Sequence, residues 1–301
     1  MSEVLVEVEG RTLRLTNLEK VLYPGTGTTK GEVLNYYAQI APVMLPHLRD
    51  RAVTRIRWPN GTTGQSFYEK NTPQGTPSWV RTVSVPTSGS RTASGREGTL
   101  DFPIVDDLAT LTWLANLAAL ELHVHQWSVG RNGRPRNADR LVIDLDPGEP
   151  AGLHECCQVA LLVRDALGER GLETRPVTSG SKGLHLYADL PKRLRPEDST
   201  ALAKEVAEDL QREHSGLVTA TMTKAKRSGK VFLDWSQNAG SKTTIAPYSL
   251  RGRDRPMVAA PRTWAEIEDG AADALDIEHL GFAQVLERAA SRGDLFAAGT
   301  E

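Results

Sequence analysis

The sequence predicts an α+β domain whose central sheet is mainly antiparallel and flanked by helices. Three observations favour this class: strand-like runs alternate with amphipathic helical segments in the second half of the chain, neighbouring strand-like runs are joined by short turns, and neither an internal repeat nor a coiled-coil heptad is present. The 301 residues, of which 39% are hydrophobic and 25% charged, are typical of a globular chain that buries a sizeable core.

The first part of the chain predicts short strands around one capped helix. Alternating residues over 4–16 predict a strand or hairpin, and Thr29 with Glu32 has the capping-box spacing that begins a helix reaching about Leu48. The further expectations for this part are strands at 52–58 and 66–70, a Ser-, Gly- and Arg-rich loop at 86–98, and an apolar helix at 106–122.

The second half predicts alternating strands and helices. The expected elements, in order, are an apolar strand that ends at Pro147, a helix at 151–170, a strand–loop–strand unit at 173–190, a helix at 197–214, strand-like runs at 217–223, 230–235 and 243–249, and a helical segment from Thr263 onward.

Two carboxylates lie in the apolar run that ends at Pro147. Side chains alternate along a strand, so Asp144 and Asp146 point to one face while the intervening Leu and Ile side chains point into a core. Two carboxylates held close together on rigid backbone repel each other unless a cation lies between them. Hard oxygen ligands of this kind suit Mg²⁺ or Mn²⁺. The spacing therefore predicts a divalent-metal site at the end of this strand.

A Gly- and Ser-rich loop is expected between two strands at 178–185. Gly180 and Gly183 allow backbone amides to approach an anion, while Ser179 adds a hydroxyl and Lys182 adds a charge. The loop does not have the Walker A spacing, which opens a helix rather than a strand. For the loop taken alone, a polar hairpin turn without any ligand is an equal alternative.

Asp234 is a single acid in the apolar strand expected at 230–235, and such a residue is seldom buried without a partner. Beside Asp144 and Asp146 it would complete three carboxylates around one or two metal ions, an arrangement suited to in-line attack at phosphorus. A salt-bridged structural residue is the alternative. The residues nearby that could neutralise a triphosphate, each equally well explained as a solvated surface side chain, are Arg227, Lys230, Gln237 and Arg251.

Imidazole and aromatic side chains give weaker signals. His123 and His125 have strand spacing, but the sequence offers no third nitrogen or sulfur ligand nearby, which favours a hydrogen-bonding role over zinc. Phe67 would ordinarily belong to a core, and a base-stacking platform is the alternative.

The net charge of −2 hides an uneven distribution of charge. Local potential, and not net charge, decides whether a polyanion docks. No apolar run is long enough to span a bilayer and the N-terminus has no signal-peptide pattern, so a cytoplasmic protein without a membrane partner is expected. The basic residues concentrated between 222 and 255 are Lys224, Lys226, Arg227, Lys230, Lys242, Arg251, Arg253 and Arg255.

Three blocks in this order resemble the archaeo-eukaryotic primase superfamily, and in particular the polymerase domain of bacterial ATP-dependent DNA ligase D and its stand-alone mycobacterial-type relatives. The blocks are Asp-Leu-Asp-Pro at 144–147, Ser-Gly-Ser-Lys-Gly-Leu-His at 179–185 and Phe-Leu-Asp-Trp-Ser-Gln-Asn at 232–238. The likeness covers nearly the whole chain, because it extends to segments at 15–24, 57–61, 244–251 and 260–264.

The resemblance implies the primase catalytic fold, with two intimately packed lobes in a single domain over 1–301. Its implied parts are an N-terminal region over 1–50 that carries a 5′-phosphate pocket, a catalytic core over 51–260, and a C-terminal helical segment over 261–301.

The activity that the resemblance implies is template-directed nucleotide addition with a preference for ribonucleotides. The enzyme would fill short gaps or extend ends in double-strand-break or excision repair by two-metal phosphoryl transfer, with primase activity as a further expectation. The implied partners are gapped or broken DNA with a 5′-phosphate, ribo- and deoxyribonucleoside triphosphates, Ku and an ATP-dependent DNA ligase, at the bacterial nucleoid.

By matching position, the resemblance also implies roles for single residues. Two divalent ions, Mn²⁺ in preference or Mg²⁺, would be held by Asp144, Asp146 and Asp234. Lys20 and Lys30 correspond to the 5′-phosphate pocket, and the first turn of a capped helix itself favours an anion at Lys30. The implied nucleotide contacts are Ser179, Lys182, Gly183, His185, His123, Arg227, Gln237, Arg251 and Phe67.

Two features depart from the family pattern. Ile56 stands where the relatives carry Lys, so one nucleotide contact is expected to be missing. The loop at 86–98 looks longer than in the ligase-fused form, which favours a stand-alone paralogue. Two other functions stay open: a catalytically silent DNA-end or ligase-binding module with the same fold, and a metal-dependent phosphodiesterase that uses the same carboxylates.

Overall fold

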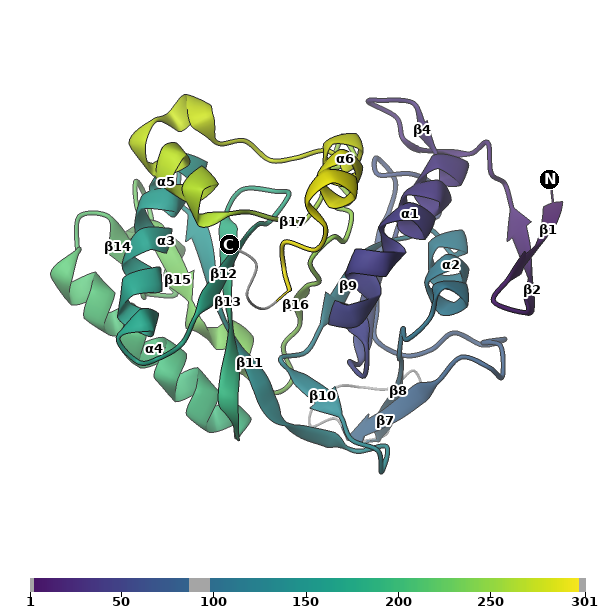
Figure 1. Cartoon of the computed structure of the whole chain (residues 1–301), viewed down its shortest axis with the longest axis horizontal. Helices are drawn as coiled ribbons and strands as arrows, with labels where there is room; N and C mark the ends of the chain where they lie inside the picture. The colour runs from purple at the N-terminus through teal and green to yellow at the C-terminus, as the bar shows by residue number, and fades with distance from the viewer. Residues whose placement is uncertain (1–2, 87–97, 298–301) are drawn as a thin grey trace.

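The structure, a computed structural model, describes residues 3–86 and 98–297, which form two lobes packed against each other (Figure 1). One lobe, on the left in Figure 1, is built on a seven-stranded sheet, and the other on a four-stranded sheet. Among the named strands of the described residues, only β14 and β15 pair in parallel. The predicted α+β class with mainly antiparallel sheets is therefore confirmed.

The seven-stranded sheet has β11 and β13 at its centre, and these two long strands pair along most of their length. Its strands, in spatial order, are β14 (Val218–Thr219), β15 (Val231–Asp234), β11 (Pro135–Pro147), β13 (Leu184–Leu194), β12 (Thr174–Thr178) and β17 (Ala260–Pro261), with β10 (Trp127–Val129) also paired to β11.

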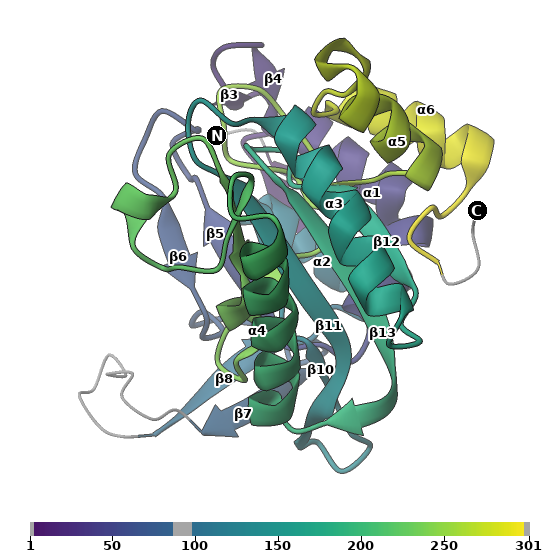
Figure 2. The same cartoon turned by 90° about the vertical axis from the view of Figure 1, so that its left-hand side faces the viewer.

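Two helices cover the outer face of this sheet, as Figure 2 shows. They are α3 (Leu153–Gly168) and α4 (Pro196–Glu213), and α5 (Trp264–Ala272) packs on α3. Leu141, Ile143 and Leu145 of β11 are fully buried against them. The other face of the sheet, which carries Val142 and Tyr187, belongs to the core shared with the second lobe.

The four-stranded sheet is covered by the capped helix α1 (Lys30–Leu48) and by α2 (Leu108–Asn116). Thr29 and Glu32 make the predicted capping box at the start of α1. The sheet contains, in spatial order, β16 (Thr244–Ile245), β9 (Ala119–Val124), β5 (Val53–Arg57) and β6 (Phe67–Glu69).

Three hairpins and the C-terminal segment complete the described chain. The C-terminal helix α6 (Phe282–Arg292) packs on α1, and Phe296 beyond it is buried between the lobes. The hairpins are β1 (Glu3–Val8) with β2 (Arg11–Thr16), β3 (Val21–Tyr23) with β4 (Thr28–Thr29), and β7 (Thr82–Pro86) with β8 (Thr99–Pro103).

The structure corrects the predicted helix at 106–122. Helix α2 ends at Asn116, and Ala118 adopts a positive φ of 58° that turns the chain. The next apolar residues then pair with β5 as strand β9. Pairing with a neighbouring strand thus overrides the helical spacing of this run.

Other predicted elements are confirmed or shorter than expected. The runs at 217–223 and 243–249 contain only the two-residue strands β14 and β16, while the strand at 230–235 is confirmed as β15. Most of the loop predicted at 86–98 lies outside the described residues. Within the described part, no helix has the length and apolar character needed to cross a bilayer.

Candidate active site

The carboxylates of the predicted metal site meet where β11 pairs with β15. The register places Asp144 directly opposite Asp234, and His185 of β13 lies opposite Asp144 on its other side. Asp146 lies two residues further along the same face of β11. The predicted alternation is confirmed, because the residues between the two acids are buried on the helix-covered face.

Each carboxylate of this group contacts a polar side chain of the protein. Asp144 Oδ1 lies 3.2 Å from His185 Nε2, and Asp146 Oδ2 lies 3.3 Å from a guanidinium nitrogen of Arg227. Asp234 accepts hydrogen bonds from the hydroxyl of Ser236 at 2.6 Å, from its amide at 3.0 Å, and from the side-chain amide of Gln237 at 3.0 Å.

The local charge at this place is predominantly negative. Partial burial and the neighbouring charge of Asp144 raise the pKa of Asp146, and Arg227 only partly offsets them. Asp234 adds to the same effect. Burial and neighbouring anions both shift the pKa of a carboxyl group in this direction.

The residues present fit a divalent cation by their chemistry, although they are not already arranged as a cage. Among residues 3–86 and 98–297, no three His, Cys, Asp or Glu side chains converge as a ready metal-binding group. Burial, followed by the charge of Asp144, disfavours the ionised form of Asp146, and carboxylate oxygens are the donors that Mg²⁺ and Mn²⁺ favour.

The loop between β12 and β13 has a defined backbone shape. The Ser179 hydroxyl accepts hydrogen bonds from the amides of Ser181 at 3.3 Å and Gly183 at 3.2 Å. Gly180 has a φ of 67°, and a Cβ atom at Gly183 would collide with the carbonyl oxygen of Leu145. Both glycines are thus required by the turn and by its close approach to β11.

Two side chains of this region differ in exposure. Lys182 is two-thirds exposed and lies 3.3 Å from a carboxylate oxygen of Glu149, so it projects from the loop. His185 is buried, and its Nδ1 lies 3.2 Å from the hydroxyl of Tyr187, which donates to the carbonyl of Ile245 at 3.0 Å. The outgoing strand thus holds the His185 ring against Asp144.

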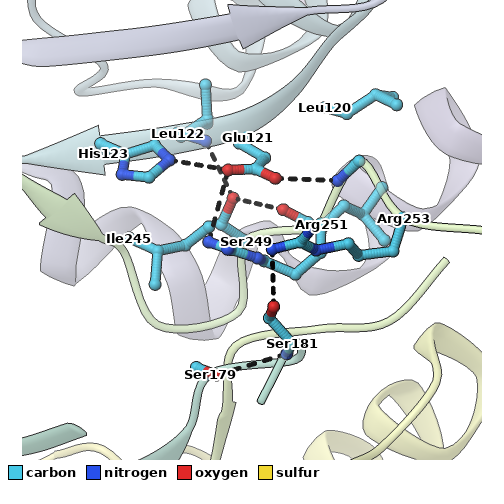
Figure 3. Close-up of polar contacts among 12 residues, drawn as sticks. Leu120, Glu121, Leu122, His123, Ser179, Ser181, Ile245, Ser249, Arg251 and Arg253 are labelled. Atoms are coloured by element: carbon cyan, nitrogen blue, oxygen red, sulfur yellow. Dashed lines mark hydrogen bonds and ion pairs between the residues drawn. The ribbon is translucent and has the colours of Figure 1, made fainter. Parts of the chain in front are cut away.

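A buried acid on the other lobe organises the opposite wall of the site (Figure 3). Glu121 of β9 accepts a hydrogen bond from the amide of Gly252 at 2.9 Å, and its Oε2 lies 2.9 Å from His123 Nε2 and 3.3 Å from a guanidinium nitrogen of Arg251. Burial alone would raise the pKa of Glu121, but the contacts with His123 and Arg251 more than offset burial, so its pKa lies below the usual value.

The segment after Ser249 connects this wall to the Gly-rich loop. Arg253 donates to the hydroxyl of Ser181 at 2.6 Å, while Arg251 remains beside Glu121 (Figure 3). His123, Arg251 and the 179–183 loop therefore belong to one connected polar network that spans both lobes. Sequence reasoning missed Glu121, although a lone acid between Leu120 and Leu122 is the same signal that identified Asp234.

The two lysines predicted for a 5′-phosphate are neighbours in the structure. The amide of Lys30 donates to the carbonyl of Lys20 at 2.8 Å, at the start of α1. The Lys30 side chain is buried and donates to the carbonyl of Thr16 at 2.6 Å. Burial, followed by the charges of Lys20 and Arg57, lowers the pKa of Lys30 to about 8.

The remaining predicted contacts lie on the four-stranded sheet. Phe67 is 41% exposed on β6, so it is not a core residue. Ile56 of β5 lies opposite Glu121 in the register, which places the departure from the family pattern beside the Glu121 network. His125 is buried with Nδ1 3.2 Å from the carbonyl of Ala52, which confirms its hydrogen-bonding role.

Comparison with known proteins shows the family of the chain. The family model described as LigD, primase-polymerase domain, matches residues 29–296. A multifunctional non-homologous end joining protein LigD from Mycolicibacterium smegmatis is 50% identical over 285 residues, which cover 95% of this chain. The bifunctional non-homologous end joining protein LigD of Bacillus subtilis is 32% identical over 264 residues, or 87% of this chain.

A solved structure agrees with the sequence matches. The polymerase domain of Mycobacterium tuberculosis ligase D, in complex with DNA, superimposes with a TM-score of 0.87 and 50% identity over 94% of this chain and 96% of that one. The chain spans 36% of the length of the M. smegmatis protein and 41% of the B. subtilis protein. A primase-polymerase is a nucleotidyltransferase, so the predicted fold and enzyme class are confirmed. The chain belongs to the LigD primase-polymerase domain family.

Proposed function

We propose that the chain is a template-directed nucleotidyltransferase that fills short gaps or extends DNA ends during double-strand-break or excision repair. The observation that supports this most is the pairing of Asp144 with Asp234 across β11 and β15, beside a Gly-rich loop from which Lys182 projects. The names of the relatives, which refer to non-homologous end joining, and the DNA complex of the structural neighbour support the pathway and the substrate.

Asp144, Asp146 and Asp234 are the proposed ligands of two divalent ions, Mn²⁺ in preference or Mg²⁺. When bound, such ions supply Lewis-acid stabilisation of the transferred phosphoryl group. The protein itself contributes the rigid pairing of β11 with β15, which fixes the distance between Asp144 and Asp234. His185 holds the Asp144 carboxylate in place from the neighbouring strand.

The triphosphate is proposed to bind between the Gly-rich loop and the wall organised by Glu121. The 249–253 segment joins these two places, because its Arg253 contacts Ser181 of the loop and its Arg251 contacts Glu121. Arg227 would move from Asp146 to the phosphates once a metal ion neutralises that carboxylate. Phe67 is exposed and would stack on a base. The full set of proposed nucleotide contacts is Ser179, Lys182, Gly183, His185, His123, Arg227, Gln237, Arg251 and Phe67.

Lys20 and Lys30 are proposed to bind the 5′-phosphate at the downstream side of a gap. Lys30 is buried beside two further cations, and a dianion would relieve their mutual repulsion. The amides of the first turn of α1 already donate to Lys20, Leu18 and Thr29, so the phosphate would be held by the lysine side chains. Preference for ribonucleotides, primase activity, a nucleoid location, and Ku and an ATP-dependent ligase as partners are parts of the same proposal.

The decisive experiment is extension of a primer on a gap that carries a 5′-phosphate, with ribo- or deoxyribonucleotides and with Mn²⁺ or Mg²⁺. We expect one or a few nucleotides to be added, faster with ribonucleotides, and no addition by the Asp234→Asn variant. The matched control is Asp165→Asn, which neutralises an exposed carboxylate on the outer helix α3. DNA binding without addition would instead indicate a silent binding module, and net shortening of the primer would indicate a phosphodiesterase.

A further inference from the structure

A second charged cavity lies at the opposite end of strand β11 from the carboxylates. It has a volume of about 410 Å³, is open to solvent, and is lined by the end of α1, the strands β10, β11, β12 and β13, and the C-terminal segment at Phe296. The arginines that line it are Arg49, Arg51, Arg136, Arg140, Arg175 and Arg193.

The cavity contains more arginines than its own acids can balance. Among the described residues its carboxylates are three; Asp139 pairs with both Arg51 and Arg193 at 2.9 Å, while Asp189 pairs with Arg175 at 2.7 Å. The third carboxylate, that of Asp50, pairs with Arg81, which does not line the cavity. Within residues 3–86 and 98–297, these pairs leave Arg49, Arg136 and Arg140 without a carboxylate partner in the cavity.

Arg140 is the buried one of these three arginines, with only 2% of its surface exposed. Its Nε donates to the side-chain oxygen of Gln126 at 3.0 Å, and its guanidinium lies 4.9 Å from the ring centre of Tyr187. Within the described part of the chain, its Nη2 is buried and has no hydrogen-bond partner. Burial, and next the charge of Arg51, lowers the pKa of Arg140 to about 9.

We propose that this cavity binds a small multivalent oxyanion of the phosphate class. A buried guanidinium with an unused donor is costly unless a partner satisfies it, and the planar fork of arginine suits two oxygens of a phosphate. Arg49 and Arg136 at the exposed rim would complete the binding. A single water could accept from Nη2, but it would not balance the surplus of positive charge.

The cavity is separate from the proposed nucleotide site. Arg140 and Asp144 share one face of β11 but are four residues apart, which is about 13 Å along a strand. Val142 of β11 and the Tyr187 ring of β13, both buried, lie between them. An anion held by Arg140 therefore uses none of the residues assigned to the triphosphate.

The test is isothermal titration calorimetry of the full chain in EDTA at fixed ionic strength, with inorganic phosphate, pyrophosphate and a ribonucleoside triphosphate as separate titrants. The informative variant is Arg49→Ala/Arg136→Ala, whose side chains are exposed at the rim, so the fold is preserved. We expect its pyrophosphate affinity to fall about tenfold or more, because each arginine donates charge-assisted hydrogen bonds. The matched control is Arg131→Ala/Arg134→Ala, two exposed arginines of the β10–β11 turn outside the cavity, and its affinity should not change.

Two further variants distinguish this cavity from the nucleotide site. Lys182→Ala should leave the binding that depends on Arg49 and Arg136 intact, while Arg140→Lys, checked for its fold by circular dichroism, should weaken it. The three titrants separate free phosphate, pyrophosphate and a nucleotide as the source of the anion. The proposal is overturned if the wild type shows no saturable binding, or if the Arg49→Ala/Arg136→Ala variant binds as tightly as the wild type. If Arg140→Lys does not fold, the rim variant alone decides.

Discussion

The two ends of strand β11 carry opposite charge surpluses on the same face of one sheet. At one end, Asp144 and Asp146 lie beside Asp234, and burial with neighbouring anions raises the pKa of Asp146. At the other end, burial with a neighbouring cation lowers the pKa of Arg140. Burial is the larger cause of both shifts and a like charge nearby is the second, so a ligand of opposite sign would stabilise the charged form at each end. The comparison teaches that buried like charges at the two ends of one strand point to ligands of opposite sign.

The carboxylate end should show the largest effect on activity. Asp144→Asn removes a proposed metal ligand without changing its size, and metal stabilisation of the transferred group is worth several kcal/mol, so we expect nucleotide addition to fall about 10³-fold or more. Single-turnover primer extension measures this loss. Affinity for gapped DNA, measured by fluorescence anisotropy, should stay close to that of the wild type. Full activity of the variant would remove Asp144 from the metal site.

A substitution at Glu121 tests whether this buried acid positions the proposed nucleotide contacts His123 and Arg251 without itself binding metal. Glu121→Gln keeps the side-chain shape but removes the charge that holds His123 and Arg251. We expect KM for the nucleotide to rise about tenfold, the size of a charge-assisted hydrogen bond, with a smaller change in kcat. The control Glu173→Gln neutralises an exposed acid. A loss confined to kcat would contradict a positioning role.

Lys30, which lies beside Lys20 and Arg57, tests whether a buried cation with cationic neighbours binds an anion. Its pKa of about 8 lies below that of a free lysine, so it loses its proton as pH rises through about 8. A 5′-phosphate favours the protonated form, and the preference for 5′-phosphorylated gapped DNA should therefore be complete near pH 7 and decline toward pH 9.

The measurement, at pH 7 and at pH 9, is the dissociation constant for gapped DNA without the 5′-phosphate divided by the constant for gapped DNA with it. We expect this ratio to fall severalfold from pH 7 to pH 9 in the wild type. In Lys30→Gln it should be close to one and independent of pH. Lys192→Gln, at an exposed position of β13, should behave as the wild type. A ratio of one at both pH values in the wild type would exclude a phosphate at Lys30.

Local patterns predicted the carboxylate end of β11 well. Alternation placed Asp144 and Asp146 on one face, and the capping box fixed the start of α1 at Lys30. Both are properties of short segments, which the sequence states directly. The glycines of the 179–183 loop were predicted to let amides approach an anion, which stays a prediction, while the structure adds that Gly183 leaves room for the carbonyl of Leu145.

The rest depended on contacts between distant segments. The run at 106–122 has helical spacing, and only the pairing of β9 with β5 makes its second half a strand. That error hid Glu121, which would otherwise have been recognised as a lone acid on a strand beside His123. The arginine cavity was equally unpredictable, because it joins residues from the end of α1, from four strands and from the C-terminal segment.

The smallest expected effect comes from Asp146→Asn, and it tests the charge surplus without any substrate. Because the folded-state pKa of Asp146 is raised, its ionisation at neutral pH costs stability that is absent below the unfolded pKa. Half of the side chain is exposed, so solvent screens the effect, and we expect Tm in EDTA to rise only about 1 °C. The difference should vanish near pH 3, where both proteins are neutral at this position. If Tm at neutral pH falls instead, Arg227 already balances the acid, and the carboxylate end carries no surplus to compare with the arginine end.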